Sequence, residues 1–366
     1  SFRETLALGA KKAPVAVPLP LDDTAVLQYT GGTTGVSKGA QLLHKNLVAN
    51  MMQVRELIVD ILDGDREVMI APLPLYHIYA FTVSLVMSDM GHEMVLIPNP
   101  RDIPGFVKEL SKHKFSSFAG LNTLFVALCN NKEFNALDFS HLKHTISGGM
   151  ALTEAAASTW QNVTGCQIQE AYGLTETSPA VSFNPYRDIR IGTIGKVVTG
   201  TQVKVISEDG TDLGFDQEGE LCVKGPQVMA GYWQRPEATA QVLDADGWFK
   251  TGDVAILAED GFIRLVDRIK DMINVSGFNV YPNEIDDIAS QHSGILECAA
   301  VGIPNSVSGE TVKLFVVKSD SNLTADDVIS HCREHLTAYK VPKEVEFRDD
   351  LPKTNVGKIL RRALRE

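Results

Sequence analysis

Basic residues are under-represented in this sequence, which has 34 lysines and arginines against 46 aspartates and glutamates and a formal net charge of −12. A general nucleic-acid binder needs a basic face to neutralise phosphates, so this balance argues against a nucleic-acid partner. The sequence also lacks an apolar run long enough to span a bilayer, and no secretory signal opens it. We therefore expect a cytoplasmic protein that is soluble, or at most peripheral to the inner face of the cell membrane.

Cysteine is scarce as well, and no two cysteines form a CxxC pair. The five are Cys129, Cys166, Cys222, Cys298 and Cys332. Their wide spacing fits neither a zinc site nor a disulfide framework, so it favours a reducing compartment. We expect all five to be structural, because free cysteine is often buried as a small hydrophobic residue.

The remaining composition is typical of a globular protein with more than one domain. The chain has 366 residues, of which 44% are hydrophobic and 22% are charged. A single core rarely serves a chain of this length, so two or three domains are expected. Residues 1–20 read as a lead-in and linker without strand–helix units, which suggests a natural protein that has lost its front part.

Hydrophobic periodicity predicts an α/β protein with three parts after this lead-in. Residues 21–190 alternate strand-like runs with helical spacing, which predicts a large layered domain with a largely parallel sheet. Residues 191–269 contain short strands and turns, including Asp260-Gly261, and predict a small antiparallel β subdomain. Residues 270–366 predict a small α+β C-terminal domain, in which Thr324 caps a helix.

A run of glycine and threonine lies between strand-like residues 25–28 and a lysine. It reads Thr30-Gly31-Gly32-Thr33-Thr34-Gly35-Val36-Ser37-Lys38. Glycines let backbone N–H groups turn toward an anion, threonine hydroxyls add donors, and the lysine adds positive charge. Because the lysine follows a serine, this is not a Walker loop. The pattern predicts a phosphate loop, with a flexible surface turn as the alternative.

Further segments carry polar groups beside glycine or aromatic residues. They are 72–80 with His77, 147–150 with Gly149, 172–176, 247–253, 266–271, 275–285 and 351–359. Taken singly, five of the residues have a structural alternative. The alternatives are a core histidine at His77, a core tyrosine at Tyr172, a turn aspartate at Asp253, a turn glycine at Gly277 and a solvated lysine at Lys358.

In this order the segments resemble the adenylate-forming enzymes, which include acyl-CoA synthetases, luciferases and peptide-synthetase adenylation domains. The resemblance runs from about residue 22 to the C-terminus and is greatest to bacterial long-chain fatty acyl-CoA ligases. Met150 departs from the commoner Gly-Gly-Ala-Pro pattern of the family.

The resemblance implies roles for these residues. ATP and coenzyme A would be bound by Thr30, Gly31, Gly32, Thr33, Thr34, Gly35, Lys38, Gly149, Tyr172, Gly173, Asp253, Arg268 and Gly277. The implied catalytic residues are Lys358, Thr175, Glu176 and His77. Glu176 would hold Mg²⁺, for which a hard oxygen ligand beside phosphates is usual. Residues 21–190 would bind ATP and the acyl group, and residues 270–366 would form a mobile domain with Lys270 as its hinge.

The implied reaction joins a fatty acid to coenzyme A through an acyl-adenylate, with ATP converted to AMP and pyrophosphate. Residues 118–131 are expected to line the acyl channel. A truncated fragment that only binds ATP or acyl-AMP is the rival interpretation, as is another acid–CoA ligase. Luciferase-like oxidation and loading of a carrier protein are weaker alternatives.

Overall fold

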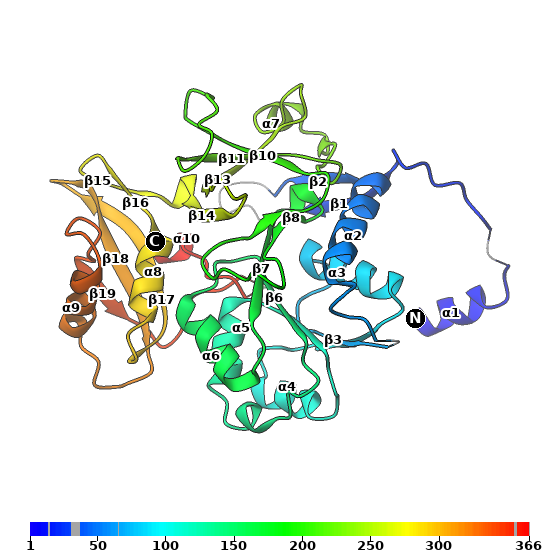
Figure 1. Cartoon of the computed structure of the whole chain (residues 1–366), viewed down its shortest axis with the longest axis horizontal. Helices are drawn as coiled ribbons and strands as arrows, with labels where there is room; N and C mark the ends of the chain where they lie inside the picture. Colours follow the sequence, from blue (N-terminus) through cyan, green and yellow to red (C-terminus); the bar gives the residue numbers. More distant parts are fainter. Residues whose placement is uncertain (14, 31–36, 65, 355–356, 366) are drawn as a thin grey trace.

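A computed structural model describes residues 1–13, 15–30, 37–64, 66–354 and 357–365. Within these residues the strands form four sheets, of seven, five, four and three strands. Figure 1 shows the C-terminal sheet as a lobe beside the rest of the molecule. The predicted α/β class is confirmed, whereas the boundaries drawn at residues 190 and 269 stay predictions.

The seven-stranded sheet is the centre of the large part of the molecule. Its order is β4-β3-β5-β6-β7-β8-β9; the first five strands in this order are parallel, and β8 and β9 are antiparallel to their neighbours. The strands are β3 (Val68–Ala71), β4 (Glu93–Leu96), β5 (Ser117–Gly120), β6 (His144–Gly148), β7 (Ile168–Gly173), β8 (Ala180–Phe183) and β9 (Lys196–Val197). The largely parallel sheet expected from the alternation is thus present.

Helices cover both faces of this sheet. They are α2 (His44–Ile58), α3 (Ile78–Asp89), α4 (Ile103–Leu110), α5 (Asn122–Cys129) and α6 (Glu154–Thr164). Successive strand residues point to opposite faces. Accordingly, Phe118 packs in the cluster formed with α4, α5 and α6, whereas Ala119 packs in the cluster formed with α2 and α3. The inner strands β5 and β6 are accordingly buried along their whole length.

Two smaller sheets lie above the large one in Figure 1. An antiparallel sheet contains β10 (Gln202–Ile206), β11 (Glu218–Lys224), β13 (Phe249–Leu257) and β14 (Ile263–Arg268). A second contains β1 (Thr24–Tyr29), β2 (Gly39–Leu43) and β12 (Gly231–Tyr232), and α7 (Pro236–Ala240) follows β12. Strand β12 therefore leaves the range predicted as one β subdomain and pairs with the N-terminal strands.

The C-terminal module, defined here as β15 to α10, has its own core of fully buried residues around a five-stranded sheet. Its elements are β15 (Ile273–Val275), β16 (Phe278–Val280), α8 (Pro282–Ser290), β17 (Ile295–Asn305), β18 (Gly309–Lys318), α9 (Ala325–His335), β19 (Glu344–Phe347) and α10 (Arg362–Arg365). The predicted cap of α9 is confirmed, because Thr324 accepts from the backbone N–H of Asp327, whose side chain bonds back to Thr324.

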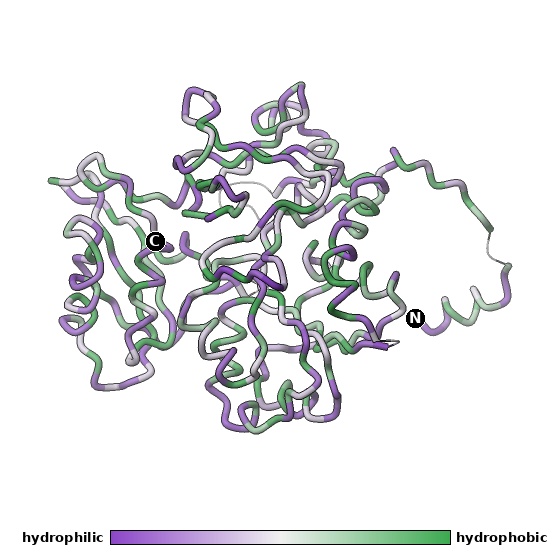
Figure 2. The backbone as a smooth tube through the Cα atoms, viewed as in Figure 1, coloured by the Kyte–Doolittle hydropathy of each residue, from purple (hydrophilic) through white to green (hydrophobic). Residues whose placement is uncertain are grey.

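The first twenty residues lie outside these cores. Helix α1 (Phe2–Gly9) has no buried residue, and Figure 1 shows it standing apart from the sheets. In Figure 2 the hydrophobic residues of this arm are interspersed with hydrophilic ones. The helix begins with a capping box between Ser1 and Glu4, which satisfies end N–H groups without tertiary contacts.

All five cysteines are free and buried, as the sequence predicted. Burial raises the pKa of the Cys129, Cys222 and Cys332 thiols to about 11. Among the described residues, no helix is long and apolar enough to cross a membrane.

An aromatic cluster beneath α6 gives the first testable prediction. The Trp160 ring lies 4.8 Å from that of Phe125 and 5.1 Å from that of Phe118, and its Nε1 donates to Thr145. Trp160→Ala should lower the free energy of unfolding by about 3–5 kcal/mol, because it leaves a large cavity. Urea titration followed by circular dichroism measures this. Trp233→Ala, at a side chain 42% exposed, is the control and should cost about 1 kcal/mol or less. Equal losses in both variants would contradict the prediction.

Candidate functional site

One cavity of about 350 Å³ collects most of the residues singled out in the sequence. The predicted site residues that line it are Thr30, Lys38, His77, Gly149, Tyr172, Gly173, Thr175, Glu176, Arg268, Lys270 and Lys358. Asp253 is hydrogen-bonded to this lining, and Gly277 lies elsewhere. The predictions for Gly31, Gly32, Thr33, Thr34 and Gly35 lie outside the described residues.

Asp253 is the buried charge of the site, with 2% of its surface exposed. Tyr172 on β7 donates its hydroxyl to one carboxylate oxygen at 2.6 Å, and Arg268 on β14 lies 3.2 Å from the other. Burial raises the pKa of Asp253, and the Arg268 charge opposes that rise. Burial, and next the Asp253 charge, raises the pKa of Tyr172. This network joins the seven-stranded sheet to the four-stranded sheet at the cavity wall.

Glu176 and Lys38 meet at a tyrosine that the sequence analysis missed. Tyr232 on β12 donates its hydroxyl to Glu176 at 2.6 Å, and the Lys38 ammonium lies 4.9 Å from the centre of its ring. The Lys38 carbonyl also accepts from the backbone N–H and the side-chain hydroxyl of Thr30. The sequence offered only Gly231-Tyr232-Trp233, which is typical of an ordinary turn. Thr251, which also lines the cavity, was missed for the same reason.

Lys358 reaches the cavity from the C-terminal module. Its loop is held to the large part of the molecule on both sides: Thr123 donates to the Gly357 carbonyl at 3.1 Å, and Arg101 donates to the Thr354 carbonyl at 3.3 Å. Burial, and next the charge of Arg268, lowers the pKa of Lys358 to about 8. An ammonium group with a pKa near neutrality is typical of a functional site, although structural charge clusters have similar shifts.

Two glycines leave room for this arrangement. Gly149 has a φ of +87°, and a Cβ there would lie 3.2 Å from the Lys358 Cε atom. A side chain would therefore be strained and would press on the lysine. At Gly173 a Cβ would lie 2.0 Å from the Pro179 carbonyl oxygen, so only glycine permits the approach of β7 to the segment before β8.

His77 lies at the start of α3, where its Nδ1 accepts from the Tyr79 backbone N–H at 3.3 Å. Burial, and next the Lys358 charge, lowers the pKa of His77 to about 4, so the ring is neutral at pH 7. Because Nδ1 accepts, the proton of the neutral ring belongs on Nε2. His77 can therefore donate one hydrogen bond, which suits positioning better than proton abstraction.

Gly277 lies in the turn between β15 and β16, outside the residues that line the cavity. Its φ is +86°, and its N–H donates to Asn274. No heavy atom lies within 4 Å of where its Cβ would be. In this arrangement the turn alone accounts for the glycine.

The rest of the lining, called the apolar arm here, comes mainly from α2, α3 and the sheet. The arm is lined by Val54, Thr82, Val83, Ile146, Ala171, Pro179, Ala180 and Phe183. The expectation that residues 118–131 line the acyl channel is not met by this cavity. Phe118 and Phe125 instead pack against Trp160 in the core. Helical spacing shows that a face is buried, but not whether protein or ligand covers it.

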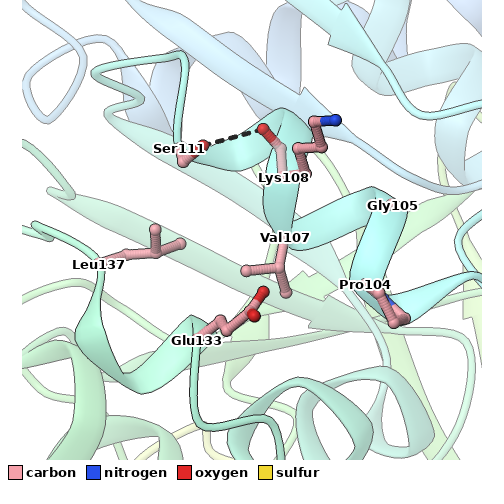
Figure 3. Close-up of a pocket in the computed structure, with 7 residues that line it drawn as sticks. All are labelled: Pro104, Gly105, Val107, Lys108, Ser111, Glu133 and Leu137. Atoms are coloured by element: carbon pink, nitrogen blue, oxygen red, sulfur yellow. Dashed lines mark hydrogen bonds between the residues drawn. The ribbon is translucent and has the colours of Figure 1, made fainter.

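A second, more open hollow lies beside α4 and the short helix η1 (Phe134–Ala136), as Figure 3 shows. It is lined by Pro104, Gly105, Val107, Lys108, Ser111, Glu133 and Leu137. Ser111 donates back to the Lys108 carbonyl of its own helix. None of the predicted site residues lies here.

The donor set fits a magnesium ion held mainly by a nucleotide. Glu176 is the carboxylate that lines the cavity, and one of its oxygens accepts from Tyr232. In the described part of the chain, no group of three or more His, Cys, Asp or Glu side chains could hold a metal ion by itself. Mg²⁺ is commonly bound by one or two carboxylates together with substrate phosphates, which matches this site.

Comparison with known families decides the family of the chain. Residues 2–233 match the profile of the AMP-binding enzymes, and residues 284–358 match that of the AMP-binding enzyme C-terminal domain. The chain belongs to the AMP-binding enzyme family. The predicted membership is thus confirmed, and the geometry above is that of an AMP-binding enzyme.

Known AMP-binding enzymes resemble the chain over nearly all of its length. It is 54% identical over 368 residues to a long-chain-fatty-acid–CoA ligase of Salmonella typhimurium; the match covers 100% of this chain and 65% of that protein. An ATP-bound structure of MatB from Rhodopseudomonas palustris has a TM-score of 0.89 at 32% identity, covering 99% and 71% of the two chains. The apo structure of MatB has a TM-score of 0.77 at 33% identity, with coverage of 99% and 71%.

The low pKa of Lys358 gives the second prediction. After reductive ¹³C-methylation, one lysine methyl resonance should titrate with a midpoint near 8, because burial disfavours the charged form. Asp253→Asn should lower this midpoint further, because it removes a negative charge that raises the pKa. The unfolded chain holds this proton more tightly, so the contribution of this lysine to stability rises with pH from about 8 toward 10.5.

Lys358→Arg identifies the signal, since the titrating resonance should disappear from its spectrum. A midpoint at the ordinary lysine value of about 10.4 would show that the ammonium is solvated.

Proposed function

We propose that the chain carries the active site of a long-chain fatty acyl-CoA ligase. The reaction would join a fatty acid to coenzyme A through an acyl-adenylate, and ATP would be converted to AMP and pyrophosphate. One observation carries the proposal: a single cavity is lined by Lys358, Glu176 and Arg268 and also by the side chains of the apolar arm. The similarity to long-chain-fatty-acid–CoA ligases supports it.

The charged residues that line the cavity suit a magnesium nucleotide. Although the chain has a net charge of −12, four cationic side chains line this cavity with a single carboxylate. The cations are Lys38, Arg268, Lys270 and Lys358, and the carboxylate is Glu176. A cleft lined mainly by one sign of charge concentrates the opposite charge, here a polyphosphate. Asp253, with two acceptor oxygens, is placed to accept from ribose hydroxyls once its partners shift.

The first step requires a carboxylate to attack the α-phosphorus. Lys358 would stabilise the negative charge that develops there, and His77 would donate its Nε2 proton to the carboxylate in a hydrogen bond. Its low pKa makes His77 the neutral donor this role requires. Mg²⁺, held by Glu176 and the phosphates, would offset charge on the leaving pyrophosphate.

The apolar arm suits an acyl chain. Its walls are mostly aliphatic or aromatic side chains of α2, α3 and the seven-stranded sheet, among them Val54, Val83 and Phe183. Apolar contact there would contribute about 0.8 kcal/mol for each buried CH₂ group. The size of the arm would thus limit the length of the acyl chain that can bind.

The second step would require the C-terminal module to turn. Lys358 lines the cavity and Gly277 does not, so one arrangement cannot use both residues at the same acyl carbonyl. We propose that Lys270, in the short helix η3 (Ile269–Asp271), is the hinge and that turning brings the Gly277 face to coenzyme A. The higher TM-score with ATP-bound MatB than with apo MatB favours the present arrangement as the one for adenylation.

A second candidate function is binding of ATP or acyl-AMP without catalysis. The chain spans 65% of the length of the Salmonella typhimurium ligase, and the activity of that ligase belongs to the longer protein. The experiment below distinguishes the two functions.

Palmitate-dependent ATP–pyrophosphate exchange is the test of the proposed chemistry. Wild-type chain should catalyse it, and Lys358→Ala should lower the rate by about 10²–10³, the loss usual for a group that stabilises developing charge. Lys343→Ala removes an exposed lysine of the same module and should leave the rate unchanged. ATP binding without exchange in folded wild-type chain would favour the binding function. Exchange that persists in Lys358→Ala would remove the lysine from the mechanism.

The apolar arm gives a separate prediction. Val83→Phe should lower exchange with palmitate by about tenfold or more while sparing hexanoate, because the added bulk leaves less room for a long acyl chain. Val48→Phe adds the same bulk on α2 at a side chain 41% exposed and should not discriminate between the acids. Loss with both acids to the same degree would place the acyl chain elsewhere.

A further inference from the structure

Helix α8 begins without a cap of its own. Its N-cap residue Tyr281 makes no side-chain capping hydrogen bond, and the first helical residue, Pro282, has no N–H. The N–H of Asn283 is therefore one of the end donors that a helix must satisfy from outside. It donates to Asp267 Oδ2 at 2.8 Å. The cap comes from another part of the chain.

Asp267 lies on β14, on the other side of the proposed hinge from α8. Its side chain is 1% exposed, and its Oδ1 accepts from the backbone N–H of Arg268, which lines the cavity. Burial raises the pKa of Asp267, and the nearby charge of Arg361 opposes the rise. Asp267 itself is not among the residues that line the cavity.

The first turn of α8 is also bound to the segment that carries Lys358. Arg361, three residues beyond Lys358, donates to the Asn283 side chain at 2.9 Å and to Asp286 at 2.5 Å. Two backbone hydrogen bonds close the loop that carries Lys358. The Thr354 N–H donates to the Lys358 carbonyl, and the Leu360 N–H donates to the Pro352 carbonyl. A continuous set of contacts thus runs from β14 through α8 to Lys358.

We propose that Asp267 is a positioning residue that aligns Lys358 with the nucleotide site by capping α8 across the hinge. This inference rests on the proposed function. The cap can form only while the N-terminus of α8 lies beside β14, so it favours the arrangement with Lys358 in the cavity. A turn of the C-terminal module that carries α8 away from β14 breaks the cap. Asp267 therefore biases the equilibrium between two arrangements without touching the substrate.

Other contacts of the same arrangement are more peripheral. Tyr281 donates to Glu218 at the start of β11, and Glu154 N–H donates to Asp287 at 3.2 Å. Asp267 differs from these carboxylates in being almost fully buried. Removing it leaves an interior N–H unsatisfied, which costs more than losing an exposed contact.

The test measures the two half-reactions of Asp267→Ala separately. Palmitate-dependent ATP–pyrophosphate exchange should fall about fivefold to thirtyfold, the range that loss of one buried cap produces. Thioester formation from supplied palmitoyl-adenylate and coenzyme A does not need Lys358 in the cavity and should stay within about twofold of wild type. Asp267→Asn keeps one acceptor oxygen and should give an intermediate exchange rate.

Thr324→Ala is the matched control. It removes the cap of α9 within the same module and far from the hinge, so it lowers module stability without a split between the half-reactions. An equal fall in both half-reactions of Asp267→Ala, or a split in Thr324→Ala as well, would reduce Asp267 to a structural role and overturn the proposal.

A second readout does not depend on activity. Because the five native cysteines are buried, spin labels can be placed at Lys132→Cys in the large part and Glu334→Cys on α9. Asp267→Ala should add a second label distance to that of wild type, and Thr324→Ala should not. An unchanged distance distribution in Asp267→Ala overturns the capping proposal. Wild-type chain that shows no exchange overturns the proposed function instead, while the label distances still decide the cap.

Discussion

The buried carboxylate of Asp253 is the interaction on which the arrangement of the site depends. It is held between the Tyr172 hydroxyl of one sheet and the Arg268 guanidinium of another. A charge removed from water is costly unless it is paired and hydrogen-bonded, so β7, β13 and β14 must keep their relative places. The cavity lies at this junction, and Arg268 faces it while the preceding residue in the chain, Asp267, faces the C-terminal module.

Those features of the fold and the site that depend on neighbouring residues could be predicted from the sequence. The apolar runs of β3, β6, β10 and β18 and the Thr324 cap depend on neighbours within a few residues, and the structure contains them. The ordered motifs likewise predicted the polar half of the cavity. Gly149 illustrates why. Its positive φ and the space needed by Lys358 both require glycine, so the glycine in the sequence already indicates the constraint.

The other features of the site depend on contacts between residues that are far apart in the chain, and no local sequence pattern indicates such contacts. Tyr232 lies 56 residues from Glu176 in the chain, and no spacing rule joins a tyrosine after a turn glycine to a carboxylate so far away. The sequence predicts that residues 118–131 line the acyl channel, yet none of them lines the cavity, because buried faces that meet protein and those that meet a ligand have the same composition. Net charge says nothing of such a local feature, since an acidic chain still gathers cations in one cleft.

The burial of every cysteine has a consequence for the proposed acyl-adenylate chemistry. A mixed anhydride is readily captured by a thiolate, which is the nucleophilic form of sulfur. None of the five cysteines lines the cavity, and burial raises the pKa of Cys129, Cys222 and Cys332 to about 11. The chain's own sulfurs are thereby withheld from acylation. An acyl-adenylate formed in this cavity would survive until an external thiol arrives, which protects the protein from modifying itself.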